Sequence, residues 1–191
     1  EVFRTATEYL DRGVCAVDLA GDEASYPASQ FTDLFAEARA LGIPFTIRAG
    51  ECHSTENVRT SIEMGAKRIG HGIAMKEDPE LMKLAAERDV GIEMCPCSNF
   101  QTKAVQEGEE YPLALFWEQG LLVTVNTDNR TVSQTSETRE LKMALELMEA
   151  SQKPVEDEKT FCRKLMENSI RTAFLPEEEK ERLRHILEKF S

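Results

Sequence analysis

Polar residues follow five short apolar runs along the chain. They are Asp18 with Gly21, Arg48 with Glu51, His71, the segment from Cys95 to Asn99, and Asn126 with Asp128 and Asn129. Glu and His side chains commonly transfer protons in enzymes, and Asp carboxylates commonly bind metal ions. Barrel enzymes place such groups where their strands end. The pattern therefore predicts one shared site, although Glu51 or His71 taken singly is as often an ordinary loop residue.

The segment 44–72 contains this arrangement twice. An apolar run leads into Arg48 and Glu51, a stretch with helical periodicity follows, and a second apolar run leads into His71. Ser54 is a favoured residue just before the first turn of a helix. The segment therefore predicts a strand, a helix and a strand, with Glu51 and His71 at the same ends of two parallel strands.

The same alternation of strand and helix runs through most of the sequence. Strands are predicted to begin near residues 14, 45, 68, 91 and 122. Helices are predicted over residues 2–12, 31–41 and 54–64, from residue 78 onward, and over 112–119, 138–148, 156–174 and 176–190. We expect Val14 to Asp18 to be a short buried strand and CPCSNFQTKAV, from Cys95 onward, to be a long loop. Such alternation is typical of a parallel sheet.

The predicted fold is α/β, a partial (β/α)8 TIM-type barrel with about its last five strands, followed by C-terminal helices. A complete barrel typically needs about 250 residues, whereas this chain has 191. Five strands of one barrel leave two open edges, and folded proteins normally cover such edges. We therefore expect residues 1–191 to be the C-terminal part of a single barrel domain whose first strands are missing. The alternative is an open, doubly wound sheet.

Composition limits the classes of partner. The net charge of -12 argues against nucleic acid and anionic membrane surfaces, because binding phosphate groups depends on clustered Lys and Arg. A small neutral ligand fits this charge better. No apolar run is long enough to span a bilayer, and the first residues do not resemble a signal peptide. The number of cysteines is odd, which predicts reduced thiols in a cytoplasmic protein: Cys15, Cys52, Cys95, Cys97 and Cys162.

Five motifs carry a resemblance to a known family. VDLAGDE (17–23), TIRAGE (46–51), GHGIAM (70–75), CPCSN (95–99) and VNTDNR (125–130) together resemble the adenosine deaminase family of metal-dependent amidohydrolases. The resemblance covers essentially the whole chain, with the motifs in the family's order and at compatible spacing. It implies a (β/α)8 barrel, a single zinc ion, and hydrolytic conversion of adenosine and 2′-deoxyadenosine to inosine.

The resemblance also implies a role for each site residue. Zinc lowers the pKa of a bound water, so that hydroxide is available to attack purine C6. Asp128 matches the metal-ligating aspartate, Glu51 the carboxylic acid that protonates purine N1, and His71 the histidine that supports the attacking hydroxide. Gly21 matches a glycine whose backbone approaches the purine edge, and Asn129 the residue that hydrogen-bonds purine N7.

The sequence departs from the family pattern in its metal ligands. Arg48 stands where the family motif His-Ala-Gly-Glu has a zinc-binding histidine, and a guanidinium offers no lone pair to a metal. The family's His-x-His pair is absent from these residues, so only Asp128 remains of the implied ligands, and His53 lies too far along the loop to replace them. Zinc sites need three or four protein ligands. Arg48 either pairs with Asp128, as a fixed positive charge, or faces elsewhere.

Three functions remain open at this level. The chain is the C-terminal portion of an adenosine deaminase, an inactive purine-binding homologue because of Arg48, or a relative that acts on adenine or on adenosine monophosphate. The LAGDE segment, which contains Gly21, resembles enzymes that act on nucleosides more than those that act on adenine or adenosine monophosphate. CPCSN, with Cys95 and Cys97, lacks the spacing of a zinc-binding cysteine motif and is interpreted as a structural turn.

Overall fold

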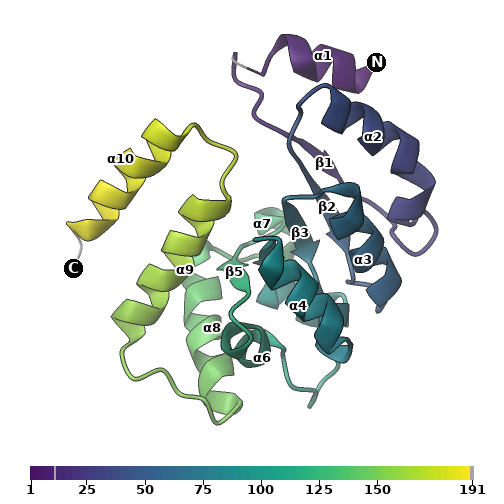
Figure 1. Cartoon of the computed structure of the whole chain (residues 1–191). Helices are drawn as coiled ribbons and strands as arrows, with labels where there is room; N and C mark the ends of the chain where they lie inside the picture. Colours follow the sequence, from purple (N-terminus) through teal and green to yellow (C-terminus); the bar gives the residue numbers. More distant parts are fainter. Residues whose placement is uncertain (11, 190–191) are drawn as a thin grey trace.

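A five-stranded parallel sheet forms the centre of the chain (Figure 1). The computed structural model describes residues 1–10 and 12–189. The strands are β1 (Val17–Leu19), β2 (Phe45–Ala49), β3 (Arg68–His71), β4 (Gly91–Met94) and β5 (Leu122–Val125). They lie in sequential order, each parallel to the next. This order confirms the predicted α/β fold of a partial barrel, since a doubly wound sheet requires strand order to reverse.

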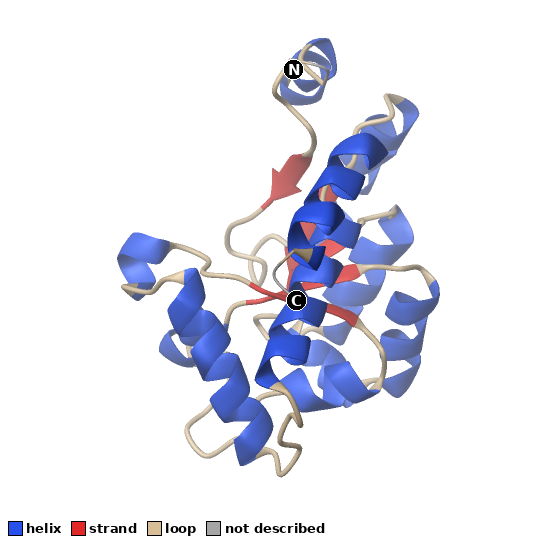
Figure 2. Ribbon diagram, turned by 90° about the vertical axis from the view of Figure 1, so that its left-hand side faces the viewer, coloured by secondary structure: helices blue, strands red, loops and turns tan. Residues whose placement is uncertain are grey.

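Helices connect the strands and cover the sheet. Those before β5 are α1 (Val2–Glu8), η1 (Ala28–Phe31), α2 (Thr32–Ala40), α3 (Thr55–Met64), η2 (Ile73–Glu77), α4 (Pro79–Glu87), α5 (Pro96–Gln101) and α6 (Leu113–Glu118). After β5 come α7 (Arg130–Ser133), α8 (Glu137–Ala150), α9 (Glu158–Thr172) and α10 (Glu177–Glu188). In Figure 1, α2, α3 and α4 lie side by side along the sheet, and α8 and α9 cover its other end. Figure 2 shows helices on both sides of most strands, whereas the strand that follows the N-terminal helix has no helix on its left.

The two faces of the sheet have different side chains. Ile47, Ile69, Ile92 and Val123 are neighbours in register on four adjacent strands, and each is fully buried. Because side chains alternate along a strand, the next row, which begins with Arg48, points the opposite way. The aliphatic row packs under the helices and forms the core, whereas the row with Arg48 faces the inside of the curved sheet.

The first strand differs from its prediction. The sequence predicted a buried strand over Val14 to Asp18, whereas β1 spans Val17–Leu19 and is only partly buried, with Asp18 exposed. The reason is that β1 pairs with β2 alone within the described residues. Its outer edge therefore stays uncovered.

The prediction of a long loop after β4, from Cys95 onward, was also wrong for the first half of that stretch. Pro96–Gln101 forms the helix α5, and Cys97, Ser98 and Asn99 within it are buried. The Cys97 backbone N–H donates to Glu140 Oε2 at 3.1 Å, so a carboxylate from α8 satisfies the start of this helix. No local pattern in the sequence predicts that Glu140, so distant along the chain, contacts the start of this helix.

The terminal helices agree with their predictions in type and differ in extent. The predicted helix over 2–12 is observed as α1, and residue 11 lies outside the described residues. The predicted helix over 176–190 is observed as α10, and residue 190 likewise lies outside them. None of the described helices is long and apolar enough to cross a membrane.

Candidate active site

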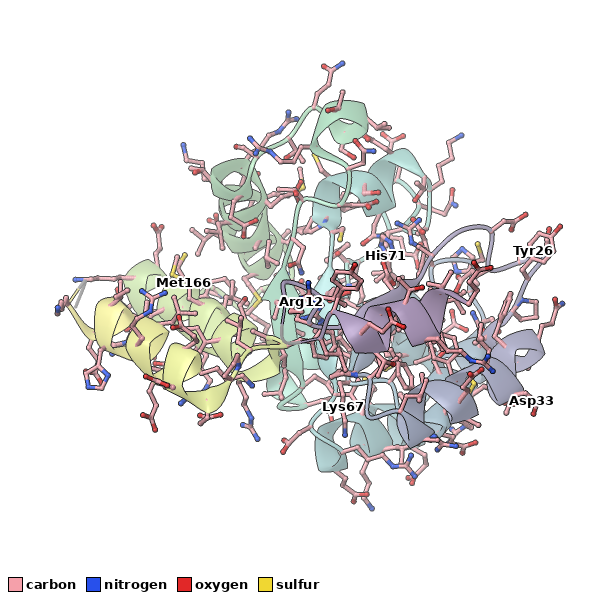
Figure 3. The ribbon with its side chains drawn as sticks, turned by 90° about the horizontal axis from the view of Figure 1, so that it is seen from above. Arg12, Tyr26, Asp33, Lys67, His71 and Met166 are labelled. Carbon is pink, nitrogen blue, oxygen red and sulfur yellow. The ribbon has the colours of Figure 1, made fainter. Side chains whose placement is uncertain are left out.

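The C-terminal ends of the strands open into one pocket. Its volume is about 340 Å³. The lining residues come from all five strand ends and from α8: Asp18, Ala20, Arg48, Gly70, His71, Glu93, Cys95, Asn126, Thr127, Asp128 and Glu137. The structure thus brings Arg48, His71 and Asp128 together, as the sequence predicted for residues at the ends of parallel strands. Figure 3 shows His71 toward the middle of the molecule, whereas Tyr26 and Asp33 lie at its edge.

Arg48 lies between two carboxylates. Its Nη2 is 3.1 Å from Asp128 Oδ1, and its Nη1 is 3.6 Å from Glu51 Oε2. Of the two orientations that the sequence left open, the structure shows the one that pairs with Asp128. The guanidinium therefore places a fixed positive charge between these two acids.

Asp128 has a second partner on its other oxygen. Ser98, on α5, donates its hydroxyl to Asp128 Oδ2 at 2.8 Å. Arg48 already occupies Oδ1, so both carboxylate oxygens are engaged. Asp128 also has a left-handed backbone, with φ of +50°, which turns the chain sharply after β5.

Glu51 is held by three side chains. Its Oε1 accepts a hydrogen bond from the Thr102 hydroxyl at 2.9 Å, and its Oε2 lies 3.4 Å from His71 Nε2. Arg48 contacts the same Oε2. Thr102 was not singled out in the sequence, because it lies within the stretch predicted as a loop.

The loop that carries Glu51 is fixed by another buried acid, Glu23. This carboxylate accepts hydrogen bonds from the backbone N–H groups of Gly50, at 2.8 Å, and Cys52. It also accepts one from Asn57 Nδ2 at 2.8 Å. Glu23 therefore holds the backbone on both sides of Glu51, and its three donors compensate for its burial. The sequence shows this residue only as the last letter of VDLAGDE.

His71 ends β3 and is almost completely buried, with 2% of its surface exposed. Its φ of +67° is uncommon for a residue other than glycine. Burial lowers the His71 pKa below its usual 6.5; the nearby Glu51 opposes this shift, and Arg48 adds to it. The imidazole is therefore neutral at neutral pH.

Other acids make the pocket electronegative. Burial raises the pKa of Asp18, although Arg48 and Arg68 oppose the shift. Burial likewise raises the pKa of Glu93 against its ion pair with Arg68. The pKa of Glu137 is raised by burial and then by the charge of a neighbouring glutamate. With Asp128, four acidic side chains therefore line the pocket.

Gly21 and Asn129 do not line this pocket, and neither does Glu51, which contacts the lining residues Arg48 and His71. Gly21 has a φ of +134°, and a side chain there would meet no atom within 4 Å. Glycine is therefore required by the backbone conformation and not by a lack of space. Asn129 caps α7, and its Oδ1 accepts hydrogen bonds from the backbone N–H groups of Thr131 and Val132. A contact of Gly21 or Asn129 with a purine stays a prediction.

The residues present do not fit a zinc site. No group of three or more His, Cys, Asp and Glu side chains that could hold a metal occurs among residues 1–10 and 12–189. Asp128 has both oxygens engaged, and His53 is exposed on its loop. Burial raises the pKa of the Cys95 thiol far above its usual value, so this thiol is protonated in the free pocket.

Sequence comparison links the chain to one family. The model of the family described as adenosine deaminase matches residues 1–190. The adenosine deaminase of Enterococcus faecalis is 43% identical over 183 residues, which are 96% of this chain and 52% of that protein. The adenosine deaminase of Haemophilus ducreyi is 41% identical over 194 residues, covering 100% of this chain and 54% of that protein. The chain thus spans about half the length of these curated relatives.

Solved structures share the fold. An adenine deaminase from Arthrobacter aurescens superimposes with a TM-score of 0.80 at 23% identity, covering 98% of this chain and 57% of that one. The N6-methyl-AMP deaminase of Arabidopsis thaliana has a TM-score of 0.85 at 23% identity, with coverages of 99% and 53%. An amidohydrolase from Burkholderia ambifaria, solved with bound zinc, has a TM-score of 0.78 at 22% identity, with coverages of 98% and 53%.

Proposed function

The chain belongs to the adenosine deaminase family, and from this we propose that it binds an adenosine-type purine nucleoside in the pocket at its strand ends. We further propose that residues 1–191 are the C-terminal part of a single deaminase barrel domain. While Arg48 occupies its present position, this part binds the nucleoside without hydrolysing it.

One observation carries the proposal. Glu51, His71 and Asp128 come from three separate strand ends, yet Arg48 contacts two of them and Glu51 contacts His71. The family resemblance implies catalytic roles for Glu51 and His71, and this convergence supports placing both side chains against the purine. We propose that both face the six-membered ring of the purine, with Gly21 and Asn129 holding its other edges.

The absence of hydrolysis follows from the metal ligands. The residues that the structure describes do not fit zinc, and the Arg48 guanidinium already neutralises Asp128. A permanently protonated group cannot take over the role of a metal that activates water.

A second candidate function is hydrolytic deamination of adenosine to inosine by a longer protein that contains this chain. The contact between Glu51 and His71 favours it, since the two side chains proposed for proton transfer and electrostatic support are both in place. Residues outside this chain would then hold the zinc. A reducing, cytoplasmic setting belongs to both proposals and is supported by the unpaired cysteines.

The acidic lining favours a nucleoside over a nucleotide. Asp18, Glu93, Asp128 and Glu137 line the pocket against one lining cation, Arg48, among the described residues. A 5′-phosphate adds a charge of the same sign as these carboxylates, which lowers its affinity. Arabidopsis proteins of the same fold were solved with GMP and with IMP, so a nucleotide is the alternative to be tested.

Calorimetric titration of the 191-residue chain tests these proposals. We expect adenosine and 2′-deoxyadenosine to bind equally with a chelator or with zinc, AMP to bind at least about tenfold more weakly, and adenine to bind more weakly than either nucleoside. Asp128→Asn should weaken nucleoside binding, whereas the matched change Asp89→Asn, in an exposed ion pair, should not. Zinc-dependent formation of inosine by a longer protein that contains this chain, followed by chromatography, would favour the second candidate. If no purine binds to the 191-residue chain, the first proposal is contradicted.

A further inference from the structure

A chain of hydrogen bonds leads from the core to the pocket. The Tyr111 hydroxyl donates to Asn99 Oδ1 at 2.9 Å, and Asn99 Nδ2 lies 2.9 Å from His71 Nδ1. On the other side of the ring, His71 Nε2 lies 3.4 Å from Glu51 Oε2. Tyr111, Asn99 and His71 are almost completely buried, with 2%, 0% and 2% of their surfaces exposed.

The direction of these bonds follows from Asn99. An amide has one oxygen, which only accepts, and one NH2 group, which only donates. Because the Tyr111 hydroxyl points its hydrogen at the oxygen, the NH2 group faces His71. His71 Nδ1 must then accept, because two donors cannot share a hydrogen bond.

We propose that Asn99, oriented by Tyr111, is a positioning residue that holds His71 in its neutral form with the ring proton on Nε2. The imidazole therefore offers an N–H, not a lone pair, to Glu51 and to the pocket. The fold supports this assignment, since Asn99 lies on α5, whose start is fixed by Glu140.

This tautomer adds detail to the proposed function. The role of His71 toward a ligand rests on that function. Nε2–H donates to an acceptor: the Glu51 carboxylate in the free pocket, or an oxygen of a bound molecule. In the second candidate function, His71 would thus stabilise a negative charge that develops on the bound molecule and would not remove a proton through this nitrogen. The tautomer itself is a property of the free chain, so it can be tested without any ligand.

Nitrogen NMR of the chain labelled with ¹⁵N-histidine reads the tautomer directly. The chain has three histidines, and the spectra of His53→Gln and His185→Gln assign the remaining signals to His71. We expect Nε2 of His71 to show the shift of a protonated ring nitrogen and Nδ1 that of a bare, hydrogen-bonded one. A protonated Nδ1, alone or together with Nε2, would overturn the proposal.

Two variants test the cause of this preference. Asn99→Asp replaces the donor with an acceptor of the same shape, so the proton should move to Nδ1. Tyr111→Phe removes the hydroxyl that orients the amide, so the single tautomer should become a mixture. If Asn99→Asp does not fold, Tyr111→Phe and the unmodified chain still decide. An unchanged His71 spectrum in a folded Asn99→Asp chain would show that Asn99 does not position the ring.

Discussion

At the residue scale, Arg48 is the side chain that sets this site apart from its family pattern. It compensates the charges of Asp128 and Glu51 from a position where only 29% of its side chain is exposed. An ion pair with this little exposure is screened less by water than a surface pair. Arg48 therefore contributes to the stability of the strand ends around the pocket as well as to their charge.

Removing this cation should leave two carboxylates close together without compensation. We expect Arg48→Met to lower the free energy of unfolding by about 1–2 kcal/mol. Arg171→Met is the matched control, because Arg171 forms an exposed pair with Asp89; it should cost less than about 1 kcal/mol. Urea denaturation measures both values. Equal losses for the two variants would show that the guanidinium adds nothing special at the pocket.

His71 predicts a pH dependence of stability. Its pKa is lowered in the folded chain, chiefly by burial, so below pH 6.5 the unfolded chain takes up a proton that the folded chain does not. The free energy of unfolding should therefore fall as the pH drops below 6.5. The charged groups facing the ring are Glu51, Arg48, Asp128 and Glu23.

The variant His71→Gln should remove this part of the pH dependence, since glutamine does not titrate. Urea denaturation between pH 5 and 7.5 measures the slope; the variant should show a flatter curve than the unmodified chain. His185→Gln, at an exposed position on α10, serves as the control. A slope that persists in His71→Gln would assign the effect to another group.

At the element scale, helix α9 packs closely against the sheet. Asn168 donates from α9 to the carbonyl of Val123 on β5 at 2.8 Å. Gly91, at the start of β4, leaves room for the end of the same helix, because a side chain there would lie 2.8 Å from Thr172 Cγ2. The glycine is thus needed for close approach between helix and strand, not for an unusual φ.

The variant Gly91→Ala should force α9 away from the sheet. We expect a loss of about 1–3 kcal/mol in the free energy of unfolding, as is usual for overpacking. Adding Thr172→Ala should restore part of this loss, because it removes the nearest methyl group. Thr172→Ala alone is the control for the lost methyl. Urea denaturation measures the free energy of unfolding of the three variants. If Thr172→Ala restores no stability to Gly91→Ala, the strain does not arise from contact with Thr172.

At the scale of the whole molecule, the sheet has a protected middle and an open first edge. β3 pairs with a strand on each side, whereas β1 has three residues and pairs with β2 alone in the described part of the chain. We expect the amides of β1 to exchange with deuterium fastest among the strands and those of β3 slowest. Hydrogen exchange read by mass spectrometry measures this order. Equal protection of β1 and β3 would indicate that another segment covers the edge.

The sequence predicted the sheet and the convergence of its strand ends well. Apolar runs and helix-ending glycines are local signals, so β2 to β5 and most helices lie where they were expected. The contacts that fix the pocket are not local. Glu23 reaches Gly50, Glu140 reaches Cys97, and Asn99 reaches His71 across long stretches of sequence. No residue pattern announces such pairs, which is why α5 was predicted as a loop.

The left-handed backbone at His71 and Asp128 limits how this pocket can diversify. Only glycine and a few residues such as Asn, Asp and His adopt that conformation readily, and a β-branched residue there is strained. If His71 and Asp128 were randomised, most folded variants would carry glycine, Asn, Asp or His at these two positions. New ligand preferences would instead have to arise at neighbours with ordinary geometry, such as Thr127.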